Sequence, residues 1–198
     1  MGTLRITRFN GTLRNLSNDP HRMTAAHPLT GSATAYLQDR CRMQVQLAAP
    51  LLDPQGRHRL WGSFGPAPFG ILNPMTTPTR LLTFKRGNVH RIRFDLHADR
   101  TRATGQMWAE YRRLKFDFPG YKDGQAKKTL LSRIKSGLVN GLVIRDENPR
   151  PSGRLVVGDM TSRRELRFSV FTLWRQGLIS GLLNSAGAPG KLAQKFSQ

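Results

Sequence analysis

The sequence predicts a mainly β protein: an antiparallel meander that forms a curved sheet or open β-groove, followed by two C-terminal amphipathic helices. Several runs before residue 120 alternate apolar with polar side chains, as half-buried strands do. Turn-forming sequences such as Asp53-Pro54 and Arg86-Gly87-Asn88 separate these runs. After Gly120 the apolar residues recur at helical spacing instead.

The strands begin before residue 18, and a loop is expected over 18–28. Clear alternating runs follow at 41–49, 57–64, 91–98 and 103–111. Successive side chains of a strand point to opposite faces, so the apolar members of these runs share one face of the sheet. Two interpretations stay open: the C-terminal helices cover this face as a core, or it lines a groove. The candidate lining is Met43, Val45, Leu47, Leu60, Phe64, Ile92, Phe94, Leu96 and Met107.

Residues 65–74 interrupt the strand pattern because they contain three prolines. Proline lacks the amide donor that a central strand needs, but it fits the first turn of a helix. We therefore expect a short helical turn that is entered through Pro68 and ended by Asn73-Pro74.

Two helices with a short strand at 154–158 between them are expected after residue 120. The first carries apolar residues at helical spacing from Leu130 to Leu142, and the second ends at Ala188-Pro189-Gly190. Glycine disfavours helix interiors, so both helices should be interrupted at Gly137, Gly141, Gly177 and Gly181. The apolar stripe of the second helix is a candidate docking face and consists of Phe171, Trp174, Leu178 and Leu182.

The length of 198 residues suits one domain with a sizeable core. Within it, residues 1–120 are expected to form the β-groove segment and residues 121–198 a helix–strand–helix cap. The formal net charge is +20, from 32 Lys and Arg against 12 Asp and Glu. Such an excess attracts nucleic acids, anionic lipid head groups or acidic proteins. A solvated outer face of the sheet explains the same charge equally well.

Catalytic chemistry has little support in this sequence. The single cysteine, Cys41, excludes an internal disulfide and a cysteine-based metal site, and its place in a strand predicts a small buried side chain. Asp95, His97 and Asp99 share one strand face, which is more typical of a solvated polar surface than of a metal site. We find no nucleophile motif and no phosphate-binding loop. The prediction is a protein that is not an enzyme, with no catalytic residue, metal or cofactor.

Nucleic-acid binding is an alternative function. Arg57, Arg59, Arg91 and Arg93 fall on the polar face of predicted strands, and Trp61 and Trp108 lie near them in the sequence. Arginines around aromatic rings on a sheet can form a stacking platform for bases, as in OB-folds. The sequence contains no RNP, KH or helix-turn-helix motif to strengthen this interpretation.

Taken in order, several short segments resemble the C-terminal part of AsmA-like proteins, relatives of the translocation-and-assembly-module and bridge-like lipid-transfer proteins. Each segment is weakly specific alone, and their common order over nearly the whole chain carries the resemblance. The segments are 13–18 (LRNLSN), 47–54 (LAAPLLDP), 71–74 (ILNP), 103–115 (ATGQM followed by YRRLK), 143–149 (VIRDENP) and the helix from Trp174 to Leu182.

The resemblance implies an open β-groove whose concave apolar face holds phospholipid or other acyl chains on their way to the outer membrane. It also implies a periplasmic or inner-membrane-associated location, reached through an anchor in a longer chain. No leader or membrane-spanning run is recognised in these residues, so a cytoplasmic location stays open. An anionic membrane surface or an envelope protein would then be a partner. A scaffold subunit that docks through the Trp174 helix is the third function considered.

Overall fold

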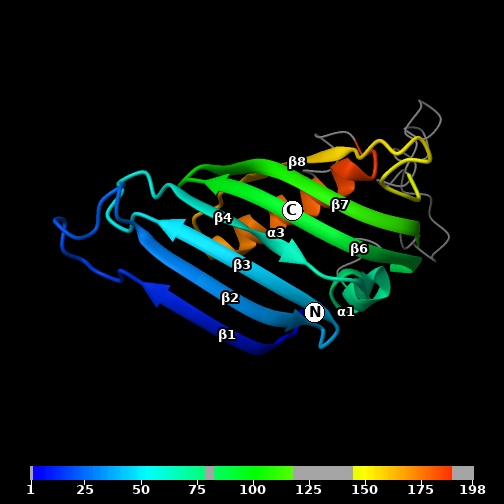
Figure 1. Ribbon diagram of the computed structural model, residues 1–198, viewed down its shortest axis with the longest axis horizontal. Coiled ribbons are helices and arrows are strands. Elements are labelled where there is room, and N and C mark those ends of the chain that lie inside the picture. The colour runs from blue at the N-terminus through cyan, green and yellow to red at the C-terminus, as the bar shows by residue number, and fades with distance from the viewer. Residues whose placement is uncertain (1, 79–82, 118–144, 189–198) are drawn as a thin grey trace.

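The protein is an open antiparallel sheet with one long helix against it (Figure 1). The computed structural model describes residues 2–78, 83–117 and 145–188. Seven strands lie side by side in the order β1-β2-β3-β4-β6-β7-β8, and β5 pairs with β6. The strands are β1 (Ile6–Arg14), β2 (Leu29–Leu37), β3 (Cys41–Ala49), β4 (His58–Phe64), β5 (Ala67–Pro68), β6 (Thr83–Ala98), β7 (Arg102–Asp117) and β8 (Val157–Arg163).

The predicted fold class is confirmed: all the strand pairs are antiparallel, and the sheet is not closed into a barrel. The long helix α3 (Val170–Ser185) follows the last strand, as expected for the second C-terminal helix. The predicted helix at 127–142 lies outside the described residues. The predicted strand at 154–158 is placed too early, because the paired segment of β8 runs from Val157 to Arg163.

The proline-rich segment forms the expected helical turn. Its 3₁₀ helix η1 (Phe69–Leu72) begins directly after Pro68, which confirms the predicted start. The predicted end is wrong, because the chain continues into the short helix α1 (Asn73–Thr76). Pro74 lies in the first turn of α1, where no amide donor is required, so it starts this helix instead of ending the previous one.

The turn predicted at Arg86-Gly87-Asn88 is also wrong. Strand β6 runs straight through these residues, and its pairing with β7 shifts register on both sides of Gly87. Gly87 has a φ of 121°, and a Cβ there would lie 2.8 Å from the Cα of Leu114. This glycine therefore makes an irregularity within a long strand, where its freedom at positive φ is used without reversing the chain.

Helix α3 packs against β8, β7 and β6 and passes through both of its predicted interruption points unbroken. Gly177 and Gly181 face the sheet: a Cβ on Gly177 would lie 3.1 Å from Leu96, and one on Gly181 would lie 2.4 Å from Met160. The prediction that these glycines break the helix is therefore wrong. Their missing side chains let the helix backbone approach the sheet closely, and tertiary packing offsets their weak helix propensity.

The segment before β8 is fixed by a buried asparagine. The Asn148 Nδ2 donates to the carbonyl oxygens of Ala109 at 2.7 Å and Val156 at 2.9 Å, and its Oδ1 accepts from the Val156 amide at 2.8 Å. Its backbone also pairs with Tyr111 in β7. All polar atoms of the side chain are thus satisfied without solvent, which holds this segment along β7.

Candidate functional site

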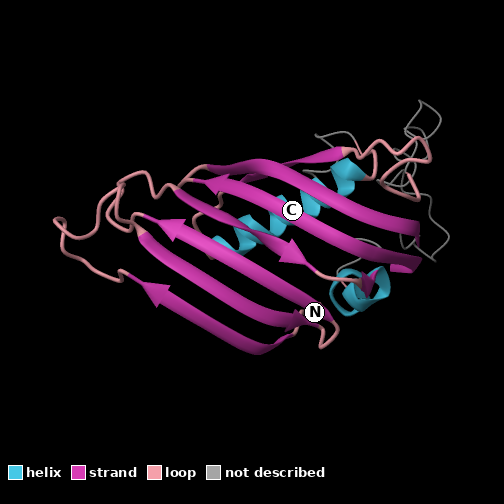
Figure 2. Cartoon of the chain, in the orientation of Figure 1, coloured by secondary structure: helices cyan, strands magenta, loops and turns pink. Residues whose placement is uncertain are grey.

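The candidate site is the part of the apolar sheet face that α3 does not cover. Figure 2 shows α3 crossing the sheet away from β1 and β2, and no described helix crosses those two strands. We call this surface the open half. The part of the same face under α3, on β6, β7 and β8, is the covered half. The open half consists of Ile6, Phe9 and Leu13 on β1, Gly31 and Ala33 on β2, and Met43, Val45 and Leu47 on β3.

One cross-strand row of leucines connects the two halves. Strand pairing places Leu13 beside Gly31, then Leu47, Leu60 and Leu96 on successive strands. Directly opposed residues share a sheet face, so these side chains lie on one surface. Leu96 is 0% exposed, Leu60 is 5% exposed, Leu47 is half-buried and Leu13 is 59% exposed. The apolar face therefore continues across the sheet beyond the strands that α3 covers.

Two glycines confirm that the surface is continuous. A Cβ on Gly31 would lie 2.9 Å from the Leu13 side chain and 3.6 Å from the Leu47 Cβ, so these two leucines border the same small residue. At the other end of the row, Gly177 of α3 lies against Leu96. Hence α3 and the exposed Leu13 lie on the same side of the sheet.

The central strand of the open half carries small residues, and we call the strip of apolar surface over Gly31 and Ala33 the trough. On this face β2 presents Gly31 and Ala33, whereas the flanking strands present larger apolar side chains. Phe9, which is 70% exposed, stands beside Gly11 on β1. The flanking strands therefore carry the larger side chains, and that of Leu13 lies against Gly31, 2.9 Å from where a Cβ of this glycine would be.

The nine predicted lining residues lie on the open half, on the covered half and on β4 between them. Met43, Val45, Leu47 and Phe64 are half-buried and lie on β3 and β4. The other five are buried in the closed core, so the structure does not present them on an open surface: Leu60, Ile92, Phe94, Leu96 and Met107. The sequence prediction did not include Phe9, Leu13, Gly31 or Ala33. The alternation of small residues with Thr and Ser over 29–37 is the signal that could have found the floor of the trough.

The predicted docking stripe of α3 lies on the flank of the helix, beside the residues that face the sheet. Trp174, Leu178 and Leu182 are half-buried against the core, and Phe171 is 68% exposed. The Trp174 Nε1–H donates to the Nε2 of His58 on β4 at 2.8 Å. The other ring nitrogen of His58, Nδ1, lies 2.8 Å from the Gly56 carbonyl oxygen. This contact directs the Trp174 flank toward β4 and the open half.

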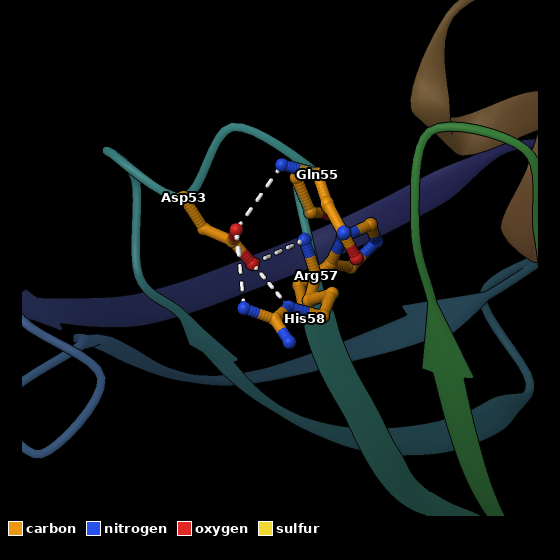
Figure 3. Close-up of polar contacts among 5 residues, drawn as sticks. Asp53, Gln55, Arg57 and His58 are labelled. Atoms are coloured by element: carbon orange, nitrogen blue, oxygen red, sulfur yellow. Dashed lines mark hydrogen bonds and ion pairs between the residues drawn. The ribbon is translucent and has the colours of Figure 1, made fainter.

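His58 is positioned by the turn that precedes β4, shown in Figure 3. The Asp53 carboxylate accepts from the backbone amides of Gln55 and Arg57, both at 3.1 Å, and from the Arg57 Nε at 2.7 Å. The hydrogen bond from the Arg57 side chain is the main reason that the pKa of Asp53 falls to about 2. The carboxylate therefore stays ionised and holds the turn between β3 and β4.

Cys41 ends the trough on β3 and is buried, as the sequence predicted. Its Sγ lies 3.4 Å from the Gly65 carbonyl oxygen, and burial raises the pKa of the thiol. A raised pKa favours the protonated thiol, so Cys41 packs here as a small apolar side chain.

The opposite face of the sheet is polar and basic. Asp95 is paired there with Arg59, at 2.9 and 2.6 Å, and lies 3.4 Å from His97. The hydrogen bonds from Arg59 are the main cause of the lowered pKa of Asp95. His97 is 64% exposed, which confirms the expected solvated face. Within residues 2–78, 83–117 and 145–188, no group of His, Cys, Asp and Glu is arranged to hold a metal ion.

Comparison with protein-family models, with curated proteins and with solved structures finds no match to the chain. Among the helices that the structure describes, none has the length and apolar character to cross a bilayer.

Proposed function

We propose that the protein binds the acyl chains of a phospholipid in the open half of its apolar sheet face. The observation that carries the proposal is the leucine row, which leaves the core at Leu60 and continues to the exposed Leu13. A contiguous apolar surface that is left exposed beside the core is typical of a binding site for an apolar ligand. An acyl chain has the required shape and chemistry.

The dimensions of the trough suit such a ligand. Neighbouring strands are about 4.8 Å apart, so β1 and β3 are separated by roughly 10 Å across the floor of β2. Each of these three strands has nine residues, which extend over roughly 30 Å. A chain lying along the floor would contribute about 0.8 kcal/mol for each buried methylene. The net charge of +20 favours an anionic head group at the rim.

The resemblance of the sequence to AsmA-like proteins supports the same ligand class. Under this proposal the chain is a groove segment in the bacterial envelope, periplasmic or membrane-associated, and contributes to phospholipid transport toward the outer membrane. The function is non-enzymatic, because holding and releasing an acyl chain requires no bond to change.

The test is lipid binding by the purified protein and two charge variants. Lipids that co-purify are extracted and identified by mass spectrometry, and affinity is measured with cis-parinaric acid, a fluorescent acyl chain. Leu13→Glu places a carboxylate in the trough at a position that is already exposed, so folding should be preserved. We expect its affinity to fall about tenfold or more, since one apolar contact is replaced by a charge.

Thr12→Glu is the matched control. Thr12 is the neighbouring residue of β1, points to the opposite face and would receive the same charge. Its affinity should equal that of the unmodified protein. Absence of lipid and of saturable probe binding in the unmodified protein would overturn the proposal, as would equal affinities of the Leu13→Glu and Thr12→Glu variants.

A further inference from the structure

A second surface with ligand-binding character lies on the polar face of the sheet. There Trp61 of β4 and Trp108 of β7 border an open hollow of about 320 Å³. Leu60 points into the core, so its neighbour Trp61 must point to the other side of the sheet. Apart from Gly62 and Phe94, the other residues that line the hollow are polar and include Arg91 and Arg93 of β6.

The two tryptophans lie on adjacent cross-strand rows. Trp61 is paired with Asp95, and Trp108 is paired with Arg93, which is itself beside Ser63. Strand β6 therefore passes between the aromatic rings and places one cation and one carboxylate between them. Both tryptophans are half-buried, so their rings are supported by the sheet yet accessible from solvent.

The carboxylate is already neutralised, whereas two of the cations are not. Arg59 holds Asp95 through two hydrogen bonds, and its guanidinium lies 4.8 Å from the centre of the Trp61 ring. Arg91 and Arg93 are exposed, and their side chains make no hydrogen bond or ion pair with any residue in the described part of the chain. The hollow thus combines aromatic surface with unpaired positive charge.

We infer that this hollow binds single-stranded nucleic acid, with bases stacking on Trp61 and Trp108 and phosphates contacting Arg91 and Arg93. Stacking on aromatic side chains and electrostatic contact with the backbone are the two components of sequence-tolerant single-strand binding. A duplex would bury its bases and could offer only phosphates. This surface lies on the opposite side of the sheet from the lipid trough, so the two ligands do not compete for space.

The experiment measures fluorescence anisotropy of a labelled 12-nucleotide single strand of mixed sequence over a range of salt concentrations. Trp108→Ala should weaken binding at least fivefold. This factor corresponds to the lower end of the range measured for the loss of one stacked base. The Arg91→Gln/Arg93→Gln double variant should lower the salt slope by about 1.4, which corresponds to two phosphate contacts on a single strand. Since both arginines are exposed, this variant is expected to fold even if the tryptophan variant does not.

The matched control is Arg102→Gln/Arg163→Gln. These two arginines are paired across β7 and β8 on the same polar face but lie outside the hollow. The control removes the same charge and should leave the affinity within about twofold. Equal losses of affinity in both double variants would show that the strand is attracted to the basic face as a whole, and would overturn the proposed site. The proposal would also be overturned if heparin displaced the labelled strand as effectively as the unlabelled strand does, because heparin carries charge and sugar but no bases.

Discussion

The covered and open halves of the sheet share one apolar face but differ in the size of their side chains and in their partners. In the covered half, Leu96 and Met160 pack closely against Gly177 and Gly181 of α3, and the buried face of this helix also includes Leu173 and Ser180. In the open half, the central strand carries Gly31 and Ala33, and Leu13 and Phe9 are exposed beside it. The same alternating pattern thus produces a core in one place and a surface trough in the other.

The difference shows that a helix completes the core only where its backbone can approach the sheet. Gly177 and Gly181 allow that approach over β6, β7 and β8. The flank of α3 with Trp174 marks the border, since it is hydrogen-bonded to β4 and half-buried. Four experiments test this comparison.

The largest difference is expected from truncating the two ends of the leucine row. Leu96→Ala removes a fully buried side chain beneath α3 and should lower the free energy of unfolding by about 4 kcal/mol. Leu13→Ala, at the exposed end, should lower it by only about 0.5 kcal/mol. Urea unfolding of both variants gives the two values. Similar losses would mean that the open half is packed as tightly as the covered half.

Adding one methyl group should reveal the same contrast. The Cβ of Gly158→Ala would lie 2.1 Å from the Gly181 carbonyl oxygen, so helix and strand must separate, at a cost of about 3 kcal/mol in unfolding free energy. Gly11→Ala in the open half meets the exposed Phe9 ring at 3.1 Å and the Ser32 carbonyl oxygen at 3.3 Å, and should cost under about 1 kcal/mol because the ring can move into solvent. Thermal and urea denaturation measure both. A tolerated Gly158→Ala would contradict the close approach of α3 to β8.

The border between the halves depends on the contact between Trp174 and His58. Trp174→Phe keeps an aromatic ring but removes the indole N–H, so about 1 kcal/mol of unfolding free energy should be lost with the hydrogen bond. Amide hydrogen exchange should rise at the start of α3 and stay unchanged in β8. Uniform acceleration along the whole helix would show that the contact does not act locally.

The smallest effect concerns the turn that joins β3 to β4. The pKa of Asp53 lies at about 2 in the folded protein, below its ordinary value of 3.8, mainly because Arg57 donates to it. Its carboxylate therefore stabilises the fold above about pH 4, and this contribution is lost as the pH falls toward 2. Melting temperatures of the Asp53→Asn variant should be less dependent on pH in that interval. An unchanged pH profile would exclude this role.

Part of the fold and of the candidate site could be predicted from local sequence patterns. Alternation identified β3, β4 and parts of β6 and β7, together with the apolar identity of Met43, Val45 and Leu47, but not the bounds of β1 and β2. Helical spacing identified the helix around Trp174. Glycine was the main source of error. Gly87 was assigned to a turn and Gly181 to a helix break, because propensity describes a residue without its tertiary neighbours.

The sequence by itself determined that this protein has an antiparallel sheet with one apolar and one basic face, since a period of two leaves each side chain only one face to occupy. Only the tertiary structure decided which part of the apolar face is core. That outcome depends on where α3 crosses the sheet, and the crossing is set by contacts such as Gly158 with Gly181, which are distant in sequence. The tertiary structure also brings Trp61, Trp108 and Arg93 to one surface, because strand pairing aligns residues that no local pattern connects.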